Sequence, residues 1–115
     1  MTATKLLPIP VVRNEDGYFH HPDILHFWAV TMAGAEHCTK EQWQAFEAEA
    51  GAKTQIVSLE NEAADHPAYV AYYDRAEGVS TWNPEPPAGW WLVEISDGED
   101  GPFAVFATHA EAVPA

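Results

Sequence analysis

The chain has 115 residues, of which 47% are apolar and 12% aromatic, and eighteen acidic residues against five basic ones give a formal net charge of −13. This length suits one domain with one modest core, and the apolar content excludes a disordered tail. The charge excludes direct binding to nucleic acid, because phosphate contacts require Lys and Arg, and no apolar run approaches the ~18 residues that a membrane span needs.

The N-terminal segment is expected to be extended. Residues 6–12, LLPIPVV, alternate proline with apolar residues, and proline is confined to edge strands because it has no N–H to donate. The sequence RNEDG at 13–17 is typical of a turn, in which Gly17 allows a positive φ. We therefore predict a first hairpin that pairs Val11–Val12 with Tyr18–His20.

A short helix is predicted to begin at Pro22. Proline is favoured in the first turn of a helix, where its missing N–H is not needed. Ile24, Phe27 and Trp28 follow at i, i+3 and i+4 and form one apolar face. Gly34 is expected to end this helix.

The strongest helical signal covers residues 39–51. Thr39 and Gln42 have the spacing of a capping box. Trp43, Phe46 and Ala50 form an apolar stripe at i, i+3 and i+7, which is typical of an amphipathic helix. Gly51 is suited to the left-handed conformation that follows the last turn of a helix.

A strand and a further helix are predicted next. Residues 54–60, TQIVSLE, have the composition of a short strand. The helix is expected over 65–78, with Asp65 as N-cap, Pro67 in its first turn and Gly78 as its stop. Its apolar stripe consists of Tyr69, Tyr72, Tyr73 and Ala76. The DHPAY that begins it faintly echoes the earlier HHPDI.

The C-terminal part is predicted to be a β-hairpin. Residues 80–89, STWNPEPPAG, contain three prolines and are expected to form an extended connector. In the strand over 90–96, alternation places Trp91, Val93 and Ile95 on one face, which we expect to be the core face. The Asp-Gly pairs of DGEDG suit a tight turn. Both faces of the returning strand are apolar, so the register stays open.

Together these elements predict an α+β fold, in which a small antiparallel sheet with the C-terminal β-hairpin carries two to three packed helices. We expect a single domain over 1–115, with residues 1–8 and 111–115 frayed.

Trp90 has two interpretations. It shares a strand face with Leu92 but also with Glu94. In the first, a helix or the proline-rich connector covers it. In the second, it is a partly exposed anchor for a partner, because tryptophan is enriched at interface hot spots.

Histidines make a metal site conceivable without specifying one. His20, His21, Asp23 and His26 lie within seven residues. Zinc takes three or four N, S or O ligands in a tetrahedron, but this spacing matches no established motif. Surface or turn histidines are the simpler interpretation, so no metal and no cofactor is predicted.

Signatures of catalysis are also lacking in the sequence. There is no Gly-rich phosphate loop and no Gly-x-Ser-x-Gly elbow, and DGEDG lacks the alternating ligands of a calcium loop. Cys38 has no activating base beyond His37 next to it. We therefore expect a protein that is not an enzyme. A lone cysteine and a start that is poor in signal-peptide features favour the cytoplasm.

Several short patterns resemble a known group of proteins. They are PVVRNEDGYFHHPD at 10–23, HPAY at 66–69, W-x-P-x-P-P-x-G at 82–89, WWLVEISDGEDGP at 90–102 and the AVF that follows. They are similar to small accessory proteins of lambdoid-type phages and prophages. The resemblance implies a phage origin and a bacterial cytoplasm, and it carries over no functional residues.

The unequal distribution of charge leads to a functional hypothesis. Residues 54–115 hold eleven acidic residues and one basic residue, Arg75, and such a field attracts basic surfaces. We expect a non-enzymatic binding protein that engages a host or phage protein, and in the sharpest version it acts as a DNA mimic. The predicted partner-binding residues are Glu85, Trp90, Glu94, Asp97, Glu99 and Asp100. The alternatives are a metal-binding module or metal-dependent enzyme built on the histidines, and a structural protein that forms a homodimer through its aromatic faces.

Overall fold

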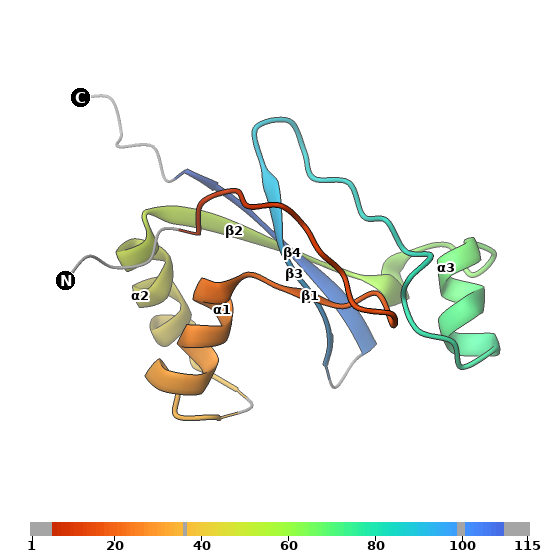
Figure 1. Ribbon diagram of the computed structural model, residues 1–115, viewed down its shortest axis with the longest axis horizontal. Coiled ribbons are helices and arrows are strands. Elements are labelled where there is room, and N and C mark those ends of the chain that lie inside the picture. The colour runs from red at the N-terminus through yellow and green to blue at the C-terminus, as the bar shows by residue number, and fades with distance from the viewer. Residues whose placement is uncertain (1–5, 36, 99–100, 110–115) are drawn as a thin grey trace.

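One four-stranded antiparallel sheet organises the chain, with its strands in the order β1-β3-β4-β2 (Figure 1). The structure is a computed structural model and describes residues 6–35, 37–98 and 101–109. The strands are β1 Phe19–His20, β2 Ala52–Ser58, β3 Trp91–Gly98 and β4 Gly101–His109. With its C-terminal β3–β4 hairpin and its helices, the molecule has the predicted α+β fold.

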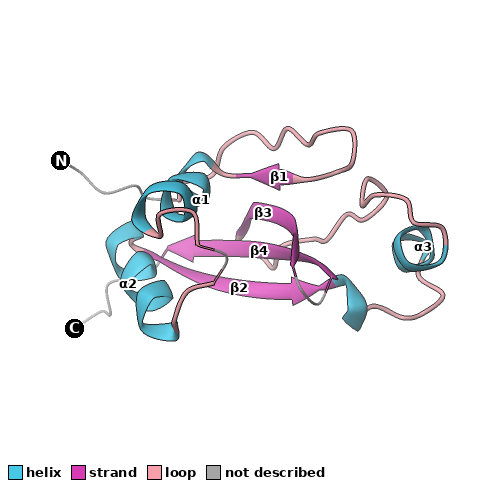
Figure 2. Cartoon of the chain, turned by 90° about the horizontal axis from the view of Figure 1, so that it is seen from below, coloured by secondary structure: helices cyan, strands magenta, loops and turns pink. Residues whose placement is uncertain are grey.

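The helices are short, and two of them continue into π-helical turns. They are α1 Pro22–His26 with the π-helix η1 Phe27–Thr31, α2 Lys40–Ala50, the 3₁₀ turn η2 Leu59–Asn61, and α3 Pro67–Tyr69 with the π-helix η3 Val70–Asp74. Figure 2 shows α1 and α2 near one end of the sheet and α3 beyond the other end.

Each face of the sheet carries its own buried core cluster. The cluster beneath α1 and α2 consists of Leu6, Ile24, Phe27, Phe46, Ala50, Ala52, Val93, Val105 and Ala107. The cluster on the α3 side consists of Leu59, Ala68, Val79, Trp82, Ile95, Ala104 and Phe106. We call them the first and the second cluster. Each apolar face of β4 therefore packs on one of these two clusters. The strand register that the sequence left open is the one that produces this packing.

A β-bulge in β3 overturns the predicted core face. Leu92 pairs with Phe106 and Glu94 pairs with Val105, so Val93 is the extra residue. A bulge inserts one residue and reverses the alternation beyond it. Trp91 and Val93 therefore pack on the first cluster, whereas Ile95 packs on the second. The prediction that all three share one face is wrong.

The first predicted hairpin is also wrong in its pairing. β1 pairs with the middle of β3, where Phe19 is opposite Ile95, and not with Val11–Val12. The segment that precedes β1 is held by side-chain contacts and not by strand pairing. Leu6 is fully buried although fraying was expected over residues 1–8, and its carbonyl accepts a hydrogen bond from Trp91 Nε1 at 2.6 Å.

Two histidines begin the two short helices in the same way. Nδ1 of His21 accepts from Asp23 N, and Nδ1 of His66 accepts from Ala68 N, each at 3.0 Å. A proline follows each histidine at the first helical position. The echo of HHPDI in DHPAY is thus a repeated His-Pro cap, and the predicted N-cap Asp65 is replaced by His66.

Helix α2 forms as predicted. The Thr39 hydroxyl accepts from Gln42 N, the Gln42 side chain accepts from Thr39 N, and Gly51 ends the helix with a φ of 67°. Its inner face carries Phe46, which packs against the Phe27 ring with a centroid distance of 4.6 Å. This stacking attaches η1 and α2 to the same face of the sheet.

Candidate functional site

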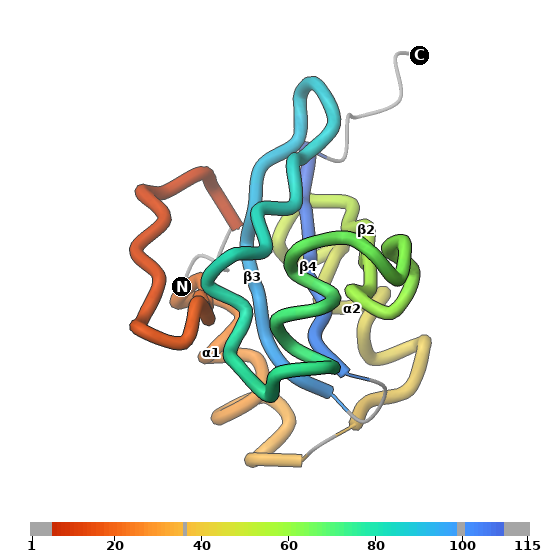
Figure 3. Tube along the Cα trace, turned by 90° about the vertical axis from the view of Figure 1, so that its right-hand side faces the viewer, coloured from red at the N-terminus to blue at the C-terminus, as the bar shows by residue number. Residues whose placement is uncertain are grey.

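The predicted partner-binding residues do not form one surface. Trp90 immediately precedes β3 and Asp97 lies near its other end, about 20 Å away at the rise of a strand. Glu85 is exposed in the proline-rich connector, whose course to the start of β3 can be followed in Figure 3. Glu99 and Asp100 lie outside the described residues.

Trp90 is partly buried against the second cluster. Its backbone N–H donates to Pro87 O at 2.9 Å, so residues 87–90 form a turn that leads into β3. These contacts favour the interpretation in which Trp90 is covered.

Glu94 is not a surface residue, which corrects its assignment to a partner-facing site. The bulge turns its side chain to the face of Val105, and only 5% of the residue is exposed. Burial raises the pKa of the carboxyl group to about 7. Its Oε2 lies 3.6 Å from Nε2 of His20. Burial lowers the pKa of His20. Both shifts favour the neutral forms of this pair.

Asp97 instead belongs to an open hollow at the hairpin end of the sheet. The hollow has a volume of about 490 Å³ and lies between the helical segment α3–η3 and the two hairpin strands. We call it the tyrosine–acid hollow, and its lining residues are Glu60, Tyr69, Tyr72, Tyr73, Asp97, Gly98 and Gly101. Within the described ranges, its lining joins three tyrosines to two carboxylates and contains no lysine or arginine.

The tyrosines of the hollow are packed on one another and tied to the carboxylate. The Tyr73 ring packs against Tyr69 in a tilted arrangement and against Tyr72 in a T-shaped one, at centroid distances of 4.6 and 4.9 Å. The Tyr72 hydroxyl donates to Asp97 Oδ2 at 2.8 Å, and this hydrogen bond raises the pKa of Tyr72 to about 12. Burial, followed by the charge of Asp97, also raises the pKa of Tyr18. The carboxylate is therefore held in position by phenol groups that stay protonated at neutral pH.

Sequence reasoning identified Asp97 but not its surroundings. The predicted apolar stripe holds in part: Tyr69 and Tyr72 are partly buried against the second cluster, whereas Tyr73 is 40% exposed. The signal that the sequence offered for this site was the combination of three tyrosine hydroxyl groups with an acidic hairpin turn. Their meeting with Asp97 is a tertiary contact that periodicity does not reveal.

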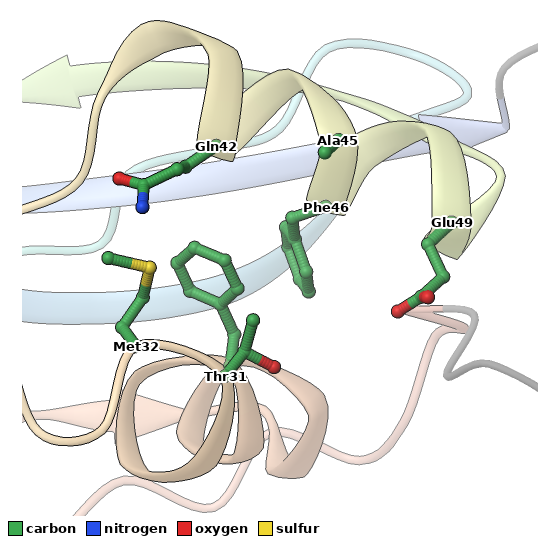
Figure 4. Close-up of a pocket in the computed structure, with 7 residues that line it drawn as sticks. Thr31, Met32, Gln42, Ala45, Phe46 and Glu49 are labelled. Atoms are coloured by element: carbon green, nitrogen blue, oxygen red, sulfur yellow. The ribbon is translucent and has the colours of Figure 1, made fainter.

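A second hollow of about 210 Å³ lies between η1 and α2. Figure 4 shows Met32 and Thr31 on one side and Gln42, Phe46 and Glu49 of α2 on the other. It combines apolar walls with a rim of neutral polar groups and one carboxylate, and no pair of reactive groups meets in it.

Two of the four candidate metal ligands, His21 and Asp23, take part in local hydrogen bonds that hold the N-terminal segment and α1. Because His21 Nδ1 accepts from Asp23 N, its Nε2 carries the proton and donates to Leu7 O at 2.7 Å. Asp23 Oδ2 accepts from Leu6 N at 3.0 Å, and His26 is exposed at the end of α1. Over the described ranges, no three His, Cys, Asp or Glu side chains are grouped so that they could hold a metal ion.

Comparisons with known proteins yield no relative: no family model, no curated protein and no solved structure matches this chain. Within the described part of the chain, none of the helices has the length and apolarity that crossing a bilayer requires.

Proposed function

We propose that this protein is a non-enzymatic binding protein of phage or prophage origin that engages a basic surface on a host or phage protein. The tyrosine–acid hollow is the proposed centre of contact. The observation that carries the proposal is the hydrogen bond of Tyr72 to Asp97 within a group of three tyrosines and two carboxylates.

The chemistry of the hollow suits an arginine or lysine side chain. A carboxylate forms charge-assisted hydrogen bonds with either cation, and a tyrosine ring attracts a cation to its face. Tyrosine is also enriched at protein interfaces, where it contributes a large contact area. Asp97 is already oriented by Tyr72, so little further ordering is required when a partner binds.

The net charge supports a sharper form of the proposal, which is DNA mimicry. Ten more acidic than basic residues lie in 54–115, and such a field accelerates encounter with a basic groove. In this form, carboxylates of the hairpin end occupy the positions of phosphates and block a nucleic-acid-binding protein.

The test is affinity capture from a bacterial lysate with the wild-type protein and with a variant that combines Glu60→Gln and Asp97→Asn. We expect the wild type to retain a basic, nucleic-acid-binding protein at low salt and to release it at high salt. The double variant should lose it, and the wild type should inhibit nucleic-acid binding by the captured protein.

The matched control combines Glu41→Gln and Glu49→Gln, which removes the same charge from the exposed face of α2. Retention by this control assigns binding to the hollow and not to overall charge. If no basic protein is recovered at low salt, or if both double variants behave alike, the proposal is wrong.

A further inference from the structure

A separate pocket surrounds Glu94 on the other face of the sheet. Its volume is about 260 Å³, and most of its wall is apolar. The lining residues are Trp28, His37, Cys38, Trp43, Ile56, Glu94, Phe103 and Val105. Three aromatic side chains and one carboxyl group thus face the same space.

The aromatic side chains are fixed by their own packing. Trp28 meets the edge of Phe27 at a centroid distance of 5.0 Å, and Trp43 packs on the same ring at 5.4 Å. Trp43 Nε1 also donates to Thr54 Oγ1 at 2.9 Å. The pocket is therefore built on η1, α2 and the sheet, and its walls are set before any ligand enters.

We propose that this pocket binds a small organic cation, with its apolar body between Trp28, Trp43 and Phe103 and its positive charge at the carboxylate of Glu94. The proposal does not depend on the function assigned to the tyrosine–acid hollow, because it concerns different residues on a different face of the sheet.

The lining favours a cation over the other classes of small ligand. Among the residues that the structure describes, no lysine or arginine lines the pocket to receive an anion. A carboxylate in an apolar surrounding is costly unless an opposite charge accompanies it, and the faces of tryptophan and phenylalanine attract cations. His20 is poorly suited to supply that charge, because burial lowers its pKa.

The ionisation of Glu94 gives the binding a pH dependence. Since its pKa is about 7, the carboxyl group is largely neutral at pH 6 and largely charged at pH 8. The other titratable groups that face it are His20 on β1, and His37 and Cys38 in the pocket wall. Burial raises the pKa of Cys38, so its thiol stays neutral over this range.

The experiment is an NMR titration of the ¹⁵N-labelled full chain with benzyltrimethylammonium, whose charge does not change with pH. We expect saturable shifts of the indole signals of Trp28 and Trp43 at pH 8. Affinity should fall about tenfold in the Glu94→Gln variant, and by a similar factor in the wild type at pH 6. Benzyl alcohol, a neutral probe, should bind equally to both proteins at both pH values.

The matched control is Glu49→Gln, which removes one charge from the neighbouring hollow on α2 and should leave the affinity unchanged. Unfolding of the Glu94→Gln variant would leave the pH comparison on the wild type as the deciding measurement. Absence of saturable shifts at the two indoles, or an affinity that is the same at pH 6 and pH 8, would overturn the proposal.

Discussion

At the scale of single residues, Glu94 connects the bulge in β3 to the dependence of stability on pH. Its pKa is about 7 in the folded chain, against 4.5 for an unperturbed Glu. Between these values the folded state holds a proton that the unfolded state has lost, so stability falls as pH rises from 4.5 to 7. A difference of this size corresponds to about 3 kcal/mol.

We therefore expect Glu94→Gln to be more stable than the wild type above pH 7, by up to about 3 kcal/mol, and similar to it near pH 4. Urea unfolding at both pH values measures the difference and cancels the titration of the other carboxylates. Glu41→Gln, on the exposed face of α2, is the control and should show no such change. A gain in stability that is equal at both pH values would contradict this account of Glu94.

The two His-Pro caps allow a comparison of one residue type in two contexts. His66→Ala removes one cap and should cost about 1 kcal/mol. His21→Ala removes a cap and also the hydrogen bond to Leu7, so about 2–3 kcal/mol is expected. Thermal unfolding of both variants measures the order. His21→Asn, which can cap but cannot reach Leu7, should fall between wild type and His21→Ala. A His21→Asn variant as stable as the wild type, with a loss in His21→Ala no larger than that in His66→Ala, would refute the second role of His21.

At the scale of elements, the sequence correctly predicted the helices and strands whose limits are determined by residues close to one another in the chain. Helix α2 was predicted with both ends because Thr39, Gln42 and Gly51 act within a few residues of one another. The pairing of β1 and the bulge at Val93 depend instead on contacts far along the chain. Two buried faces remove the polar–apolar alternation that would have fixed the register of β3.

The turn at 13–17 shows how one element is fixed to another. Val79 N donates to Asp16 O at 2.7 Å, and Arg13 donates to the carbonyls of Gly17 and Val79. Gly17 has a φ of 94°, and a Cβ there would lie 2.5 Å from Ser80 N. The turn therefore contacts the segment before the connector at backbone distance, which only glycine allows.

Gly17→Ala should accordingly destabilise the protein by about 3 kcal/mol, from the unfavourable φ and the clash together. Gly34→Ala is the matched control, because Gly34 has a φ of 83° and no atom within 4 Å of its added Cβ. It should cost only about 1 kcal/mol. Chemical denaturation measures both, and a loss at Gly17 no larger than that at Gly34 would show that the backbone contact does not matter.

At the scale of the whole molecule, the sequence predicted the sign of the electrostatics but not the sites. Asp97 was named from its charge, and its tyrosine partners come from a helix that only the tertiary fold brings to the hairpin end. Glu94 was named for the same reason and is buried, because the bulge reverses the strand beyond Val93. The net charge is the same before and after folding, whereas the face of the sheet on which a charged side chain lies depends on the strand register.

A net charge of −13 on 115 residues also predicts how the folded state responds to salt. Two like charges 10 Å apart repel by about 0.4 kcal/mol in water, and folding brings many of them within that distance. Arg13 relieves little of this repulsion, because its guanidinium donates to the carbonyls of Gly17 and Val79 and to the amide oxygen of Asn83 and not to a carboxylate. Raising NaCl from 10 mM to 0.5 M at pH 7.5 should therefore increase the free energy of unfolding by on the order of 1 kcal/mol.

Near pH 4.5, where the net charge approaches zero, the same change in salt should have little effect. Urea unfolding at the four conditions measures this, and a stability that falls with salt at pH 7.5 would mean that attractive ion pairs outweigh the repulsion.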